Sequence, residues 1–245
     1  MNVEPAVQAK LLSIASVDNE LNRLAHRRRT LPEQQEVDRL QTERASRKDA
    51  AVAVEIVLDD LDRDIRKIEG EIEAVRQRAQ RDRALLEGGT IGSKQLTELQ
   101  HELGSLERRQ AVLEDDQLDV MERREASKAD HDHAGAQVSQ IDDELGDATR
   151  ARDEALADIE VAEGRCRSDR ETLVATLPSE LVTVYEKQRE RSGIGAALLQ
   201  ARRCGACRIE LDRGEIARIK AAPADAVVHC PECNAIMVRT KESGL

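Results

Sequence analysis

Apolar residues recur at alternating spacings of three and four along most of this chain, and such a heptad pattern predicts long helices that pair along one stripe. The repeat runs through residues 51–86 and resumes over residues 96–120. Residues 87–93 interrupt it with three of the chain's thirteen glycines. Two amphipathic helices joined by a short glycine-rich turn bury their stripes by folding back on each other. The pattern therefore predicts an antiparallel coiled-coil hairpin with its tip at 87–93, where Ser93 is expected to cap the returning helix.

A separate amphipathic segment precedes the hairpin's long outbound helix. Residues 1–30 predict a first helix, and Leu31-Pro32 then predicts a kink, because proline disfavours helical geometry in the residue before it. The outbound helix is expected over 32–86 and the return helix over 94–177. If the chain folds about residue 90 or 91, position i faces about position 181 minus i, so Leu24 is expected near Leu156.

The predicted seam weakens midway along the hairpin. Arg44, Arg47 and Ala51 are expected to face a stretch that contains Arg124 and His131, and few large apolar side chains remain there. A loosely packed zone would open more readily than the leucine- and isoleucine-rich segment near the tip. The alternative is that alanine simply lets the two helices approach more closely.

The pattern changes after Leu177-Pro178, where the return helix is expected to end. Residues 179–191 predict a short helix with Leu181, Val182 and Tyr185 on one face, and a glycine-containing break follows. We therefore expect two domains, a coiled-coil hairpin over 1–177 and a small domain over 178–245. The predicted fold is mainly α, a long kinked antiparallel coiled-coil hairpin with a small C-terminal domain.

Composition and charge narrow the function classes. Charged residues make up 36% of the 245 residues, and Tyr185 is the single aromatic, so a wide globular core is not expected. The net charge is −11, and the eight cationic and six acidic residues of 192–245 leave an excess of acid on the helical part. The long helices should therefore repel nucleic acid and anionic membranes. No apolar run has the length of a membrane span and the N-terminus does not resemble a signal peptide, so we expect a cytoplasmic protein with no membrane partner.

Four of the five cysteines form two C-x2-C pairs with twenty-two residues between them, and this is the strongest chemical signal in the sequence. The ligands predicted for one zinc ion are Cys204, Cys207, Cys230 and Cys233. Four thiolates leave no open coordination position, so the zinc is expected to be structural. Cys166 lies on the helical seam and is expected to serve packing rather than reactivity. His229 could replace a ligand, but four sulfurs suffice and a solvent-facing role is preferred.

These features together resemble a known family. The segment Leu96-Thr97-Glu98-Leu99-Gln100-His101-Glu102-Leu103, with Leu177-Pro178 and the two C-x2-C pairs, is similar to bacterial coiled-coil proteins with a C-terminal C4-type zinc ribbon. The resemblance implies a kinked hairpin that carries a zinc ribbon held by the four cysteines. Some members are described as adaptors for an alternative sigma factor, a flagellar transcript or secretion components. The sequence departs from the family pattern at Asn234, where glycine is usual, and no partner is carried over.

The functional hypothesis is a non-enzymatic adaptor that binds a protein partner through the zinc ribbon and the coiled-coil surfaces. No catalytic constellation or small-molecule substrate site stands out, because His101 and Glu102 are adjacent on a helix and point about 100° apart. The predicted protein-docking surface is Ile209, Leu211, Ile216 and Ile219. The alternative is a nucleic-acid-binding regulator, with Arg202, Arg203 and Arg208 on phosphates. A purely structural spacer, with no partner at the tip or the ribbon, is a third possibility.

Overall fold

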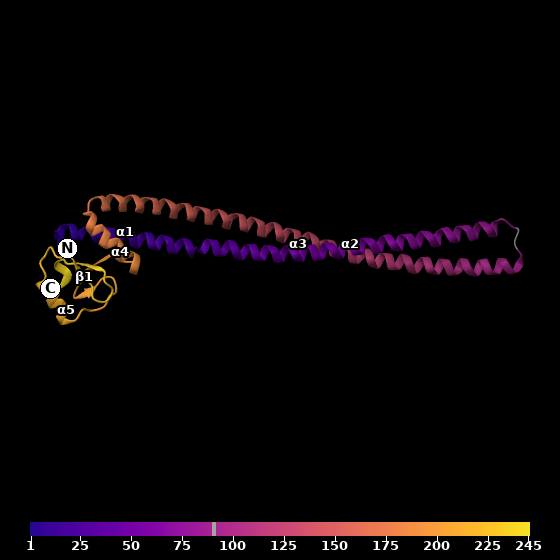
Figure 1. Cartoon of the computed structure of the whole chain (residues 1–245). Helices are drawn as coiled ribbons and strands as arrows, with labels where there is room; N and C mark the ends of the chain where they lie inside the picture. The colour runs from indigo at the N-terminus through magenta and orange to yellow at the C-terminus, as the bar shows by residue number, and fades with distance from the viewer. Residues whose placement is uncertain (90–91) are drawn as a thin grey trace. The chain divides into compact units, whose positions relative to one another are not determined.

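The computed structural model of the chain describes residues 1–89 and 92–245 (Figure 1). Its packing divides the chain into two compact units. The first, here called the ribbon unit, consists of Met1–Gln34 and Arg150–Leu245, and the second, the hairpin unit, is Gln35–Thr149. The predicted domain boundary at residue 177 stays a prediction. By packing alone, residues 1–34 and 150–177 belong to the same unit as the cysteine-rich segment.

The first two helices are separated where the sequence predicts a kink. Helix α1 spans Pro5–Arg29 and α2 spans Pro32–Glu87. Proline stands at the start of both helices, where its missing N–H costs no hydrogen bond. Thr30 ends α1, and its hydroxyl donates to the His26 carbonyl at 3.0 Å. Leu31, only 2% exposed, anchors the break because its side chain packs in a buried cluster with Leu24 and Ile159.

Helix α3 spans Ser93–Ala175 and is the returning arm of the predicted hairpin. The predicted tip lies between the end of α2 at Glu87 and this start, and its residues Thr90 and Ile91 lie outside the described residues. The Leu96 N–H donates to the Gly92 carbonyl at 3.0 Å. Gly92 is therefore at the N-cap position and Ser93 is the first helical residue, so the capping role predicted for Ser93 was wrong.

Within the hairpin unit, α2 and α3 run antiparallel and are joined by ion pairs (Figure 1). Arg76 pairs with Glu114 at 2.7 Å, and Arg83 pairs with Glu107 at 2.9 Å. The position numbers of these two pairs add to 190, and those of the pair Glu71–Arg109 add to 180, whereas the predicted hairpin register put the sum near 181. The side chains of these ion pairs are long and can pair with residues several positions from the one directly opposite. The pairs therefore give the relative direction of the two helices and only an approximate register.

The weak zone predicted midway along the seam is present. Along α2 no described residue between Leu40 and Leu61 is buried, and along α3 the same holds between Leu113 and Ile141. On the tip side of this zone, Ile72 is 4% exposed and Ala79 is also 4% exposed. Because buried apolar area is what stabilises a two-helix seam, the middle of the hairpin unit has little packing energy of its own.

The C-terminal elements of the ribbon unit form a small sheet with one helix on it. Helix α4 spans Ser179–Ser192 and ends at Gly193, whose φ of 79° is left-handed. The remaining elements are β1 (Ala196–Gln200), β2 (Arg203–Cys204), α5 (Arg213–Ala221), β3 (Val228–His229), β4 (Ile236–Val238) and the 3-10 turn η1 (Lys241–Ser243). The strand order is β2-β1-β4-β3, with β1 and β4 parallel and the other two pairs antiparallel.

One face of the ribbon's sheet shares its core with helices α1 and α4. One buried cluster joins α1, α4 and the sheet through Leu11, Ile14, Leu181, Ile236 and Val238. Tyr185, 1% exposed, lies in the same cluster, and a Cβ added to Gly195 would come within 2.5 Å of its ring. Close packing of this kind accepts no additional atom, so residue 195 must be glycine for the aromatic ring to fit.

The N-terminal residues also belong to the ribbon unit. Asn2 forms an antiparallel bridge with Ala226, and the Val3 N–H donates to the Asp225 carbonyl at 2.7 Å. The Gln8 amide, 2% exposed as a residue, donates to that same carbonyl at 3.0 Å. The first residues of the chain therefore complete the fold of a segment more than two hundred positions away.

Candidate metal centre and the surfaces around it

Two equivalent turns present the four cysteines. In the first turn the Cys204 N–H donates to the Ile209 carbonyl, and the Arg208 N–H returns to the Cys204 carbonyl. In the second, Cys230 and Asn234 repeat the same two bonds, with Ala235 in the place of Ile209. Each turn closes with a left-handed residue, with φ of 64° at Arg208 and 61° at Asn234. The left-handed conformation predicted for Asn234 is therefore confirmed, and Arg208 occupies the equivalent position.

The four sulfur atoms lie at the spacing of a zinc tetrahedron. All four are within 4.8 Å of one another, with 3.8 Å from Cys204 Sγ to Cys233 Sγ and 3.9 Å from Cys207 Sγ to Cys230 Sγ. Zinc–sulfur bonds of about 2.3 Å at tetrahedral angles place sulfurs about 3.8 Å apart. The ligand set is closed, so the cofactor is one structural zinc ion held by Cys204, Cys207, Cys230 and Cys233.

The surroundings of the thiols explain why they need a metal. Burial raises the pKa of the Cys204 thiol to about 12, against the opposing effect of backbone hydrogen bonds from Cys207 and Ala206. A buried thiolate is therefore unfavourable on its own, and a bound cation is what keeps this sulfur deprotonated at neutral pH. The backbone N–H groups then share the negative charge that remains on the sulfur.

His229 and Cys166 are the other two candidate metal or thiol residues. His229 is half-buried, and its Nδ1 is 3.1 Å from the carbonyl oxygen of Asn234. It is not in the four-cysteine cluster. Cys166 is half-buried against the helix cluster of Leu24 and Ile159, as its predicted packing role requires.

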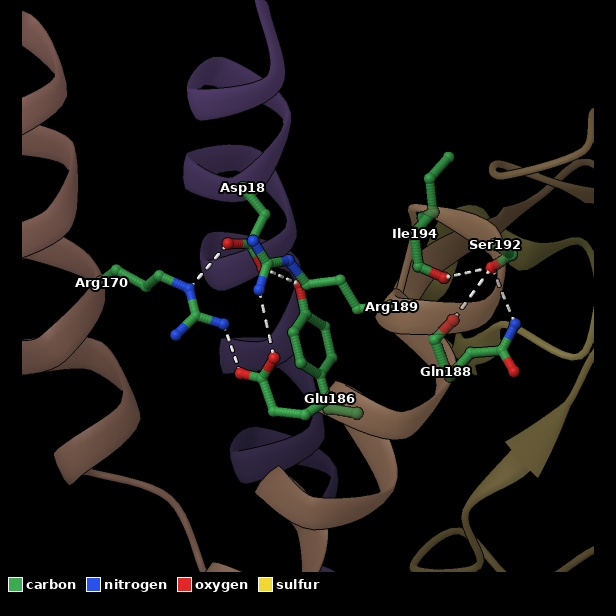
Figure 2. Close-up of polar contacts among 8 residues, drawn as sticks. Asp18, Arg170, Glu186, Gln188, Arg189, Ser192 and Ile194 are labelled. Carbon is green, nitrogen blue, oxygen red and sulfur yellow. Dashed lines mark hydrogen bonds and ion pairs between the residues drawn. The ribbon is translucent and has the colours of Figure 1, made fainter. Parts of the chain in front are cut away.

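A partly buried network of charges joins α4 to α1 and α3, and no local pattern in the sequence predicts it (Figure 2). Asp18 is 2% exposed, and its carboxylate accepts from Arg170 Nε at 2.7 Å and from the Tyr185 hydroxyl at 2.7 Å. Arg189 Nε lies 3.1 Å from the same carboxylate, and both arginines also pair with Glu186. Two cations thus balance two anions, which is the condition for burying such groups without a large penalty.

Helix α4 also contacts the second cysteine turn directly. The Gln188 amide donates to the Cys233 carbonyl at 2.7 Å and accepts from the Asn234 amide at 3.1 Å. Gln188 therefore connects the metal-binding turn to a helix whose neighbouring residues hold Asp18. Asn234 is useful here for its side chain as well as for its backbone, since glycine at this position could not reach Gln188.

The three arginines proposed for phosphate contacts have different environments. All three are exposed. Arg203 pairs with Glu210 at 3.0 Å, so its charge is already matched. Within the parts of the chain that the structure describes, Arg202 and Arg208 have no ion-pair partner. Both have left-handed backbone conformations, with φ of 65° at Arg202.

The predicted apolar docking surface needs correction. Ile219 is 0% exposed and Leu211 is 6% exposed, because both pack under the sheet with Leu199 and Met237. Ile216 is partly buried against the same cluster, and only Ile209 is exposed, at 46%. The predicted surface is therefore wrong for Leu211 and Ile219, and of its four residues only Ile209 is an exposed apolar side chain.

One more arginine serves the fold. Arg239 was among the ribbon's cations, yet its guanidinium donates to five backbone carbonyls, those of Ile219, Ala222, Pro223, Ala224 and Ala226. It fixes the loop after α5, and nothing in the sequence marks it apart from its neighbours. Its donors are occupied by these carbonyls, so it is a poor candidate for a partner contact.

Comparison with known proteins agrees with this architecture. Residues 14–193 match the family described as the CT398-like coiled coil hairpin domain, and residues 203–237 match the C4-type zinc ribbon domain. The chain belongs to the CT398-like coiled-coil hairpin family. The family resemblance inferred from the cysteine pairs and the hairpin segment is thereby confirmed.

Relatives of this family share nearly the full length of the chain. Rv2229c of Mycobacterium tuberculosis is 47% identical over 239 residues, which is 98% of each chain. A solved structure from Mycobacterium smegmatis is 49% identical, with a TM-score of 0.89 over 98% of this chain and 100% of that one. CT398 of Chlamydia trachomatis has a TM-score of 0.70 at 18% identity, over 96% of this chain and 98% of its own, and shows the fold alone.

The mycobacterial relative carries no functional description beyond its name. Among the helices that the structure describes, none combines the length and the apolar character needed to cross a membrane.

Proposed function

We propose that this protein is a non-enzymatic adaptor that binds a protein partner through the surfaces around its zinc ribbon and its helical hairpin. The observation that carries the proposal is the packing of the ribbon. Its sheet shares a core with α1 and α4, so that Ile236 and Val238 lie against Leu11 and Ile14. A ribbon fixed in this way presents its surface in a constant orientation, which lowers the entropy lost on binding a partner.

The metal centre supports a structural role for the ribbon. Four cysteines surround the site, so a bound zinc has no position for water or substrate. The buried network around Asp18 uses its charged groups on one another. These groups stabilise the fold, and the exposed surface is left for recognition.

Nucleic-acid binding remains the second candidate, because Arg202 and Arg208 are exposed cations without ion-pair partners among the described residues. Two kinds of observation weigh against it. Arg203 is paired with Glu210, Arg218 is paired with Glu215, and Arg239 is occupied by backbone carbonyls. The single aromatic, Tyr185, is buried and offers no platform for base stacking.

The proposal is tested by crosslinking and affinity capture from cells that produce the protein naturally, with and without nuclease. The wild-type chain should retain a specific protein after nuclease treatment. A Cys204→Ser, Cys230→Ser variant should lose it, because the ribbon surface depends on the metal. Captured material that disappears with nuclease would favour the nucleic-acid function, and capture of nothing by the wild type would overturn the adaptor.

A further inference from the structure

A groove in the ribbon unit lies between the C-terminal half of α1 and the first cysteine turn. The groove has a volume of ≈ 900 Å³, which lies in the range of roughly 300–1,000 Å³ that ligand-sized clefts have. One wall is α1 and the other is the turn with Gly205 and Ala206. The polar side chains that line it include Asn19, Asn22, Arg23, His26, Arg27 and Arg208.

The charged side chains that line the groove are all cationic. It contains three arginines and a histidine, and no aspartate or glutamate is among the lining residues. Arg23 is near Glu20, at 3.4 Å and in an exposed pair of little strength. Arg27 and Arg208 have no ion-pair partner within residues 1–89 and 92–245. Two guanidinium groups, one from each wall, are thus available to an anion.

Arg208 has a left-handed backbone conformation, which is unfavourable for most residues other than glycine. Its φ of 64° is the conformation that Asn234 adopts at the equivalent place in the second cysteine turn. A side chain other than glycine or asparagine costs about 1 kcal/mol or more in this conformation. The turn would form more readily with asparagine at 208, so arginine is unfavourable for the backbone at this position. We infer that contacts of the guanidinium group offset this cost.

We propose that this groove binds an acidic segment of a partner protein, with carboxylates on Arg27 and Arg208. Arginine and carboxylate form paired, directional hydrogen bonds, and the amides of Asn19 and Asn22 are suited to a peptide backbone. This inference rests on the proposed adaptor function and names the chemistry of the partner.

The charge of the groove favours a short carboxylate segment over a nucleic acid. A zinc ion with four thiolates carries about −2 next to Arg208, and this offsets part of the positive charge of the lining. The ribbon unit as a whole has twenty-one cationic and twenty acidic side chains, so without the three arginines of the groove it has no excess of positive charge. A long phosphate backbone gains affinity from many such contacts, whereas two or three carboxylates need only the groove.

The test measures binding of fluorescein-labelled octaglutamate by fluorescence anisotropy to the full-length zinc-loaded protein. The wild type should bind this peptide and ignore labelled octaglutamine. Arg27→Ala with Arg208→Asn should weaken octaglutamate binding at least tenfold. Arg208→Asn also relieves the backbone strain, so this variant should be as stable as the wild type or more so, and loss of binding then cannot come from unfolding.

The matched control is Arg29→Ala with Arg213→Ala. It removes the same charge from α1 and from the ribbon at exposed positions that do not line the groove, and it should change affinity less than threefold. Equal losses in the two double variants would show that only net charge matters and would overturn the proposal. Tighter binding of labelled oligothymidine of eight nucleotides, sensitive to Arg27 and Arg208, would also overturn it in favour of nucleic acid.

The same variants separate this inference from the adaptor function. If the wild type captures a nuclease-resistant partner and the Arg27→Ala, Arg208→Asn variant captures it equally well, the groove proposal fails and the adaptor stands. If the wild type captures no partner, the adaptor fails whatever the peptide does.

Discussion

The ribbon unit and the hairpin unit are similar in length but are stabilised in different ways. Among the described residues, the ribbon unit contains twenty-one buried apolar side chains and the hairpin unit contains eight. The hairpin unit has seventeen cationic and twenty-nine acidic side chains, so it carries all of the chain's excess negative charge. A two-helix seam has one line of contacts, whereas the ribbon unit encloses its core from several sides. Most of the buried apolar side chains thus lie in the ribbon unit, and the excess negative charge lies in the hairpin unit.

The largest effect that would test this contrast is removal of zinc. Chelation, or Cys204→Ser with Cys230→Ser, should unfold the ribbon unit and leave the hairpin unit helical, because binding of zinc by four cysteines contributes roughly 10 kcal/mol or more to folding. Hydrogen exchange should show lost protection in residues 1–34 and 150–245. Elemental analysis of the untreated protein should give one zinc per chain.

The shared core makes this expectation specific. Since α1 and α4 pack on the sheet, they should lose protection together with residues 203–237. Rapid exchange confined to 203–237, with α1 and α4 still protected, would mean that the helices fold without the ribbon. Exchange throughout 35–149 would mean that the two units unfold as one.

The second test removes a seam contact from the hairpin unit. Ile72→Ala should destabilise the seam by about 2–5 kcal/mol, because the side chain is 4% exposed. Ile56→Ala on the same helix is the matched control, since Ile56 is 56% exposed and its truncation should stay within about 0.5 kcal/mol. Hydrogen exchange in α2 measures both, and zinc content should not change in either. Equal effects would contradict the description of the middle as weakly packed.

The third test overfills the ribbon unit. Gly195→Ala places a methyl group within 2.5 Å of the Tyr185 ring and should destabilise this unit by about 1–3 kcal/mol. Gly164→Ala is its counterpart, because that glycine lies within α3 in the same unit and nothing is within 4 Å of its added carbon. Alanine there should be neutral or stabilising by up to about 1 kcal/mol. Thermal unfolding of the two variants should move in opposite directions.

The smallest effect appears at high pH. Burial first, and then the hydrogen bond to Asp18, raises the pKa of Tyr185 well above its usual value near 10. A raised pKa favours the protonated form in the folded state, so this contribution is fully present below about pH 10 and is lost as pH rises further. Chemical denaturation followed at pH 9 and pH 11 should show an additional loss in the wild type that Tyr185→Phe lacks. Parallel losses in both proteins would assign the alkaline sensitivity to other groups.

Much of this architecture was predictable because its signals are local or periodic. The spacing of Cys204, Cys207, Cys230 and Cys233 specified the metal ligands, and Leu31-Pro32 specified the break between α1 and α2. The heptad repeat predicted the hairpin because each arm carries one apolar stripe. These features depend on short motifs or on regular spacing along the chain.

The features that were missed depend on contacts between distant segments. Nothing near Asp18 in the sequence indicates that Arg170 and Arg189 neutralise it, since exposed aspartates are common on helices. Leu211 and Ile219 were expected on the surface because a small separate domain with one tyrosine has too little core to bury every apolar side chain. One face of the sheet instead packs against α5, and the other face packs against α1. The core on the α5 side therefore buries both Leu211 and Ile219.

The position of Tyr185 has a practical consequence. The chain has no tryptophan and no phenylalanine, so this tyrosine is its only intrinsic fluorophore. Its light emission therefore comes entirely from the ribbon unit, and the hairpin unit is optically silent. A tryptophan introduced at Leu61 or Ile72 would give the hairpin unit a fluorescence signal distinct from that of Tyr185. Selective excitation of the tryptophan would then report on the hairpin unit separately from the ribbon unit in one sample.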